Sequence, residues 1–247
     1  MSLAVKSEAI VLRSIRYGEA DRILHMYTPD RGRIAAIAKG ARRSRSRFGA
    51  RLEPFMQIRV VLHEGRGELY TVTGAETVDA RPALRESAAV LDAAARACDA
   101  VGRLFETEDP HPEVFALLAN ELTLLAAGMP DAEWAYASNE LAFRLKLLLA
   151  AGIVPQLSSC ANCGEHGPLI GFSAPAGGVV CSACEGVGFR LDEDAYVFMT
   201  DALGRPLADT PLVSERALRQ AERAIRETAE HHAHVRLRPA ALSESLS

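Results

Sequence analysis

The stretch DRILHMYTPDRGRIAAIAKGA, residues 21–41, contains two runs of alternating apolar residues separated by the turn-forming sequence Pro-Asp-Arg-Gly. Alternation with a period of two predicts β-strands that bury one face. Three similar runs occur before Arg81, at residues 8–18, 55–65 and 68–78. Five short strands in so short a segment predict a small antiparallel β-barrel, of which the OB-fold is one frequent form. The number of strands does not distinguish an OB-fold from an SH3-like barrel.

Beyond Pro82 the sequence becomes rich in Ala and Leu at helical spacing, which predicts helices over 83–106, 112–128 and 131–151. A later helix is predicted from Ser214, because Ser214 is a typical N-cap and Glu215 supplies an acidic residue in the first turn. We therefore expect an α+β, multidomain protein in which the barrel is followed by an all-α domain.

Two Cys-x-x-Cys pairs lie within the helical half, in CANCGEHGPLIGFSAPAGGVVCSACEGVG. Two residues between ligands allow both thiolates of a pair to reach one tetrahedral zinc, and Gly164 allows the chain to turn beneath the sulfurs. The segment between the pairs is predicted to be a small hairpin. We expect one zinc ion in a four-cysteine, zinc-ribbon-like insertion, with the ligands Cys160, Cys163, Cys181 and Cys184.

With four cysteine ligands the zinc has no open coordination position, so its predicted role is structural. The alternatives are two disulfides, which a cytoplasmic location disfavours, or four unpaired cysteines that happen to have this spacing. A redox role for either pair is less expected, because thioredoxin-type motifs usually stand alone at the start of a helix in a strand-helix-strand unit. Cys98, the fifth cysteine, lies in a helical pattern and is predicted to be a buried apolar residue.

The segment KGARRSRSRFGARL, residues 39–52, here called the basic loop, carries six cations and no carboxylate. Residues 1–81 contain 15 Lys and Arg against 9 Asp and Glu, whereas the rest of the chain contains 13 against 23. Like charges in one loop repel each other unless an anion neutralises them, so we expect a nucleic-acid site here, with an acidic protein surface as the competing interpretation. The candidate DNA-binding residues are Lys39, Arg42, Arg43, Arg45, Arg47, Phe48 and Arg51.

Phe48 has two possible roles, because an aromatic ring among arginines can stack on an unpaired base or anchor the loop to the barrel. The chain lacks the P-loop, dinucleotide-binding, nucleophile-elbow and helix-borne zinc-protease motifs. No catalytic residue is therefore predicted, and we expect that the protein is not an enzyme.

The segments from Tyr17 to Phe55, ELAFRLKLLLAAGIVPQLSSCANCG and FSAPAGGVVCSAC resemble the RecO family of recombination mediator proteins over essentially the whole chain. The matching motifs are Gly18–Arg22, Ala38–Gly40, Ser46–Gly49 and Gly152–Leu157. The resemblance implies an N-terminal OB-fold and a helical C-terminal domain with a zinc-binding insertion. The expected domains are 1–81 for the OB-fold, 82–157 and 190–247 for the two parts of the helical domain, and 158–189 for the zinc insertion.

The resemblance also implies a function in DNA repair without catalysis. Such proteins bind single- and double-stranded DNA, anneal complementary strands, and act with RecR to help RecA displace single-strand-binding protein. One alternative is a nucleic-acid-modifying enzyme that uses the barrel and zinc module to position its substrate, and another is a protein-protein adaptor. The N-terminus lacks a secretory signal and no long apolar run is present, so we expect no membrane association and a cytoplasmic, nucleoid-associated protein.

Overall fold

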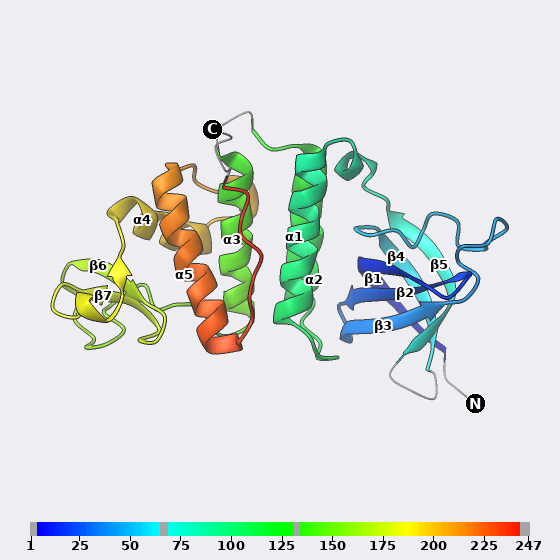
Figure 1. Ribbon diagram of the computed structural model, residues 1–247, viewed down its shortest axis with the longest axis horizontal. Coiled ribbons are helices and arrows are strands. Elements are labelled where there is room, and N and C mark those ends of the chain that lie inside the picture. The colour runs from blue at the N-terminus through cyan, green and yellow to red at the C-terminus, as the bar shows by residue number, and fades with distance from the viewer. Residues whose placement is uncertain (1–3, 65–68, 131–133, 243–247) are drawn as a thin grey trace. The chain divides into compact units, whose positions relative to one another are not determined.

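Five strands form a closed barrel at the N-terminus of the computed structural model, which describes residues 4–64, 69–130 and 134–242 (Figure 1). They are β1 (Ala4–Tyr17), β2 (Asp21–Thr28), β3 (Gly32–Ala38), β4 (Gln57–His63) and β5 (Tyr70–Asp79), in the order β1-β2-β3-β5-β4. The predicted OB-like barrel is confirmed. One pairing differs from the expected antiparallel arrangement, because β3 and β5 run parallel where the barrel closes.

β1 is long enough to pair with both β4 and β2, and these two pairings complete the barrel. Its first half, from Ala4 to Ile10, pairs with β4, and its second half, from Ile10 to Tyr17, pairs with β2. The register shifts between Val11 and Arg13, where β1 passes from one partner to the other. Such a bulge bends a strand and increases its twist, so one strand can serve two neighbours.

Two helices pack on the barrel and share its compact unit, Met1–Ala127. They are α1 (Ala88–Leu104) and α2 (Pro112–Ala127), preceded by the short 3-10 helix η1 (Pro82–Arg85). Arg33 connects the two parts, because its side chain donates to the carbonyl of Gly102 at 2.8 Å. Gly32 has a φ of 62°, and a Cβ there would lie 2.2 Å from the carbonyl oxygen of Asp109. The β2–β3 turn therefore requires glycine at this position.

The second compact unit, Gly128–Ser247, contains the remaining helices. α3 (Ala135–Ala150) is buried on most sides and packs against α4 (Glu193–Gly204) and α5 (Glu215–Ala233). The sequence had not indicated α4 as a separate helix. The predicted N-cap of α5 is confirmed, since the Ser214 hydroxyl accepts from the Ala217 amide at 3.4 Å. This division into two units does not test the domain boundaries expected from the sequence, which remain a prediction.

A small sheet lies between α3 and α4 in the chain and contains the predicted hairpin. Its strands are β6 (Leu169–Ser173), β7 (Gly178–Cys181) and β8 (Phe189–Arg190), in the order β7-β6-β8, and η2 (Glu185–Val187) precedes β8. The short helix η3 (Leu207–Asp209) follows α4. In the part of the chain that the structure describes, no helix is long and apolar enough to span a membrane.

Candidate metal centre and nucleic-acid interface

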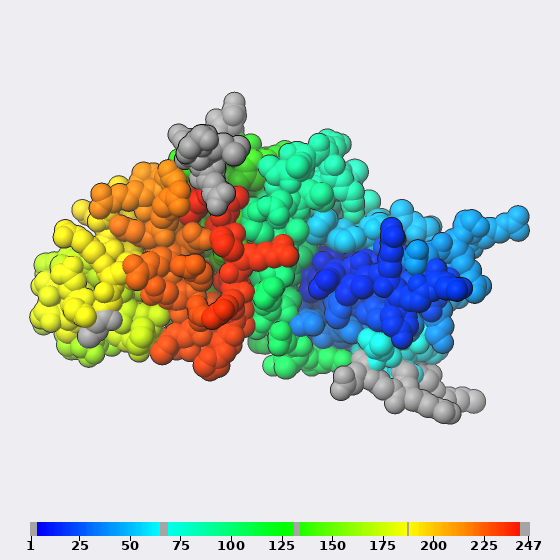
Figure 2. Space-filling view, viewed as in Figure 1, coloured from blue at the N-terminus to red at the C-terminus, as the bar shows by residue number. Residues whose placement is uncertain are grey.

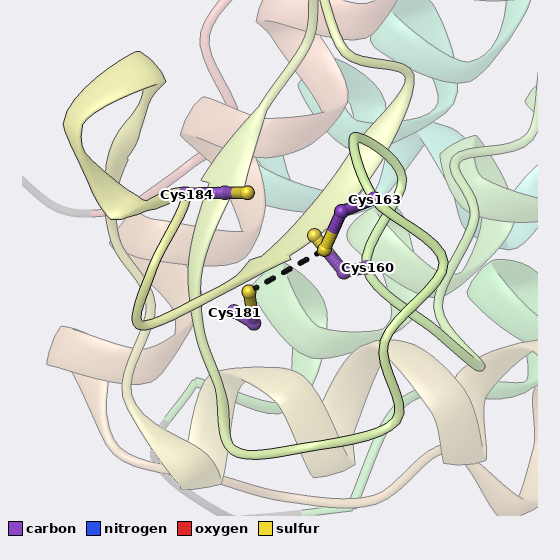
Figure 3. A group of neighbouring side chains, drawn as sticks. All are labelled: Cys160, Cys163, Cys181 and Cys184. Atoms are coloured by element: carbon purple, nitrogen blue, oxygen red, sulfur yellow. Dashed lines mark hydrogen bonds between the residues drawn. The ribbon is translucent and has the colours of Figure 1, made fainter.

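The four cysteines of the two Cys-x-x-Cys pairs converge on one point (Figure 3). Cys160 and Cys163 lie on the segment before β6, and Cys181 and Cys184 lie at and just after the end of β7. Their sulfur atoms are all within 4.8 Å of one another, and those of Cys163 and Cys181 are 3.7 Å apart. Tetrahedral zinc with Zn–S bonds of about 2.3 Å requires sulfurs about 3.8 Å apart. The arrangement therefore fits one zinc ion with four thiolate ligands.

Backbone hydrogen bonds hold the two pairs in place. The Gly164 amide donates to the Cys160 carbonyl at 2.8 Å, and Gly164 has a φ of 78°, as the predicted turn requires. The Cys184 amide closes the second turn on the Cys181 carbonyl at 3.0 Å. The Ala161 amide joins the two parts by donating to the Val179 carbonyl at 2.8 Å. The ligands are thus positioned by main-chain bonds of the module itself.

The sulfur atoms compete for negative charge. Hydrogen bonds from backbone amides, above all that of Cys181, lower the pKa of Cys160 to about 6. The Glu165 amide acts in the same direction on Cys163, but the neighbouring thiols outweigh it and raise the pKa of Cys163 to about 12. A divalent cation removes this competition, because it stabilises all four thiolates together. The chemistry of the donor set therefore favours a metal over four free thiols.

Cys98 takes no part in this cluster. Its side chain is buried in α1, and burial raises the pKa of its thiol to about 12. The prediction of a buried apolar residue is confirmed.

The basic loop joins β3 to β4, and its six cations are all exposed. In Figure 2 the light-blue segment after β3 projects from the barrel. Within residues 4–64, 69–130 and 134–242, none of the six forms an ion pair with a carboxylate. Other barrel arginines do: Arg22 pairs with Glu53 at 2.9 Å, and Arg59 pairs with Glu8 and Glu76. Among the described barrel residues, the basic loop is therefore the largest group of cations without a carboxylate partner, and Lys6, Arg13 and Arg16 on β1 are also exposed and unpaired.

Apolar side chains fix the loop to the barrel. Phe48 is 1% exposed and Leu52 is 3% exposed, and both belong to the apolar core of the barrel. Beyond them the main chain joins β1, because the Phe55 amide donates to the Val11 carbonyl at 2.7 Å. The end of the basic loop is thus fixed to the barrel by Phe48 and Leu52, and its cations face the solvent.

The burial of Phe48 corrects its inclusion among the candidate DNA-binding residues. Of the two roles left open, the structure places the ring as an anchor, and a side chain with 1% exposure offers no face to a base. The guanidinium of Arg47 lies 4.9 Å from the ring centroid. Phe48 therefore packs beneath the Arg47 guanidinium and holds this part of the loop on the barrel.

The sequence motifs Gly18–Arg22 and Ala38–Gly40 lie against each other at the start of the basic loop. The Asp21 carboxylate accepts from the Gly40 amide at 2.7 Å. Arg42 donates to the β1–β2 turn, through its amide to the Ala20 carbonyl at 2.8 Å and through its guanidinium to the Gly18 carbonyl at 3.3 Å. The start of the basic loop therefore lies against the turn that follows β1.

Tyr17, at the end of β1, was not singled out from the sequence. Its side chain is 54% exposed, and it directly precedes Gly18, to which Arg42 donates. Arg16 beside it is also exposed. An exposed aromatic ring beside arginines without carboxylate partners has a free face on which a base could stack, which the buried Phe48 does not have. The signal in the sequence was an aromatic residue at a strand end, next to a glycine turn.

Comparisons with known proteins agree on one family. A family model described as Recombination protein O N terminal matches residues 1–81, and one described as Recombination protein O C terminal matches residues 85–239. A protein of Rubrobacter xylanophilus named DNA repair protein RecO is 40% identical over 231 residues, which are 92% of this chain and 90% of that protein. Proteins of the same name from Myxococcus xanthus and Thermobifida fusca are each 38% identical, over 77% and 81% of this chain and 75% and 81% of their own lengths.

Removal of one thiolate tests the metal centre. We expect Cys163→Ser to lose zinc and unfold the segment around β6 and β7, because structural zinc contributes an apparent ~10 to 16 kcal/mol to the folding of its module. Metal analysis and limited proteolysis of the full chain measure both effects. Cys98→Ala is the control and should retain one zinc per chain. Wild-type protein purified without chelator but containing no zinc would contradict the assignment.

Removal of the Phe48 ring tests whether this side chain anchors the basic loop to the barrel. Phe48→Ala should lower the free energy of unfolding by about 3–5 kcal/mol, the usual cost of truncating a buried phenylalanine. Tyr17→Ala is the control, and its exposed ring should leave stability within about 0.5 kcal/mol. Denaturant unfolding of the full chain measures both. Equal stabilities would show that Phe48 is not buried in solution.

Proposed function

The chain belongs to the RecO family of DNA repair proteins, and from this membership we propose that it is a recombination mediator without catalysis of its own. It binds single- and double-stranded DNA and anneals complementary strands. With a RecR-type protein it helps RecA to load on DNA coated with single-strand-binding protein. Family membership supports these partners, and the geometry of the barrel supports the contact with DNA.

The observation that carries the proposal is the set of six exposed, unpaired cations on the basic loop, held by an anchored root. Guanidinium groups pair with phosphate oxygens in bidentate geometry, and their charge is always present. These contacts recognise the sugar-phosphate backbone and do not distinguish one base sequence from another. The proposed DNA-binding residues are Lys39, Arg42, Arg43, Arg45, Arg47 and Arg51, with Tyr17 in place of Phe48 as the stacking residue.

Strand annealing follows from the same charges. Two single strands repel each other through their phosphates, and a protein surface that neutralises part of this charge lowers the cost of bringing them together. Because binding is independent of sequence, the bases remain available for pairing. The chain's own part in annealing is therefore electrostatic, and zinc serves only to hold the C-terminal module in shape.

A nucleic-acid-modifying enzyme is the alternative. The two classes are separated by incubating labelled single- and double-stranded oligonucleotides with the protein and a divalent metal, with and without ATP. The proposal expects annealed products of unchanged mass. Cleaved or otherwise altered strands would support the enzyme instead.

Removal of four cations from the basic loop tests the site. On single-stranded DNA each neutralised phosphate contributes about −0.7 to the slope of log affinity against log salt, so four contribute roughly −3. Replacing Arg42, Arg43, Arg45 and Arg47 together by Ala should flatten the slope by about that amount, weaken binding to unrelated sequences alike and slow annealing. Titrations of the full chain at several salt concentrations give the slope.

Arg59→Ala is the matched control for Arg45→Ala, because both remove one exposed barrel arginine but Arg59 lies on β4, outside the basic loop. Arg45→Ala should change the slope more than Arg59→Ala. A fourfold variant with the wild-type slope and affinity would show that the basic loop is not the DNA site.

Removal of the exposed ring tests base stacking. Tyr17→Ala should weaken binding of single-stranded DNA by roughly 1–3 kcal/mol, the usual value of one stacked base. Binding of duplex or of an abasic strand should not change, since neither offers an unstacked base. Tyr17→Trp keeps an aromatic ring and should therefore retain the wild-type affinity. Leu149→Ala, which truncates a 52% exposed residue elsewhere, is the control and should leave binding unchanged. Equal losses on normal and abasic strands would argue against stacking.

A further inference from the structure

A groove of about 570 Å³ lies between α5 and β8 of the segment 158–190, here called the zinc-binding module, which contains the four cysteines and the small sheet. Four of its seven lining residues are arginines, and one is a carboxylate. This concentration of positive charge occurs in the half of the chain whose overall balance is acidic. The lining residues are Phe189, Arg190, Glu215, Arg216, Arg219, Gln220 and Arg223.

Helical spacing places the arginines of α5 along one wall. Arg216, Arg219 and Arg223 follow each other at intervals of three and four residues and are all exposed. With a rise of 1.5 Å per residue, their Cα atoms are separated by about 4.5 and 6 Å along the helix axis. Arg190 adds a fourth guanidinium from β8. The groove therefore presents a row of charges that suits a ligand with repeated negative charges.

The existing ion pairs of these arginines are of the surface type. Arg216 pairs with Asp192 at 2.7 Å, and Arg219 pairs with Glu215 on its own helix. The side chains of Arg216 and Arg219 are 76% and 55% exposed, and such pairs contribute little to stability. Arg190 forms no ion pair within the described residues. A polyanion can therefore replace these carboxylates at low cost.

The lining favours nucleic acid over an acidic peptide. Among the described lining residues Phe189 is the one large apolar side chain, and the guanidinium of Arg223 covers its ring at 4.0 Å while pairing with Glu227 at 2.7 Å. Peptide sites depend on buried apolar or aromatic anchors, which this groove does not offer. Arginines stacked on an aromatic ring and aligned in a row are suited to phosphates and bases.

We propose that the groove lined by Arg190, Arg216, Arg219 and Arg223 is a second site for the phosphate backbone of single-stranded nucleic acid. The inference rests on the proposed function, since it gives one chain two separate sites for polyanions. One strand binds the basic loop of the barrel and another binds the groove. A chain that holds two strands at once raises their local concentration for pairing.

The test uses the full chain and a short oligothymidine of about eight nucleotides, a length within the usual site size of one single-strand-binding module. Replacing Arg190, Arg216 and Arg219 together by Gln should reduce the binding stoichiometry from two oligonucleotides per chain to one and slow annealing several-fold. Arg205→Gln with Arg236→Gln is the control, because it removes exposed, ion-paired arginines of the same unit. Zinc content and thermal unfolding verify that both variants are folded.

The fourfold Ala variant of the basic loop separates the two proposals. If it also retains one oligonucleotide, and this remaining binding is lost on adding the groove substitutions, the groove site is supported. A wild-type stoichiometry of one that the loop variant abolishes would overturn the groove inference and leave the proposed function standing. Competition by polyglutamate at the groove, without binding of oligothymidine there, would also overturn it.

Discussion

The burial of Phe48 and Leu52 in the barrel core is the constraint on which the rest of the candidate interface depends. Six like charges on a free loop would spread apart, and the loop would lose much entropy on binding a strand. Anchoring by apolar side chains, together with the bond between Asp21 and the Gly40 amide, pays that cost during folding. The barrel can then present its unpaired cations to phosphates in a preformed arrangement.

The zinc-binding module obeys a comparable rule in the second unit. Its strands are short, and its own apolar cluster consists largely of the cysteines with Val180, so a metal bound by the four thiolates would supply the cohesion that a larger core would otherwise give. The module in turn positions β8, and with it Arg190 and Phe189, beside the arginine row of α5. The four-cysteine site and the proposed second phosphate site are therefore linked, because unfolding of the module on loss of a metal would remove one wall of the groove.

Local patterns in the sequence were sufficient for much of this structure. Alternation predicted the strands, spacing predicted the cysteine cluster, and Ser214 marked the start of α5. Features that depend on tertiary closure were not predictable: the parallel contact of β3 with β5, the inward direction of Phe48, and the meeting of Arg190 with α5. α4 was missed because it is short and begins directly after the zinc-binding module. Net charge was also misleading, since it concealed a cluster of four arginines within an acidic half.

Photo-crosslinking of the full chain to a single strand containing 5-iodouracil, followed by peptide mapping, tests the central claim most directly. We expect crosslinks at Tyr17 and within residues 39–51, which disappear at high salt because the contact is electrostatic. Crosslinks found only outside the barrel, with none between residues 13 and 51, would contradict the assignment of DNA to the basic loop.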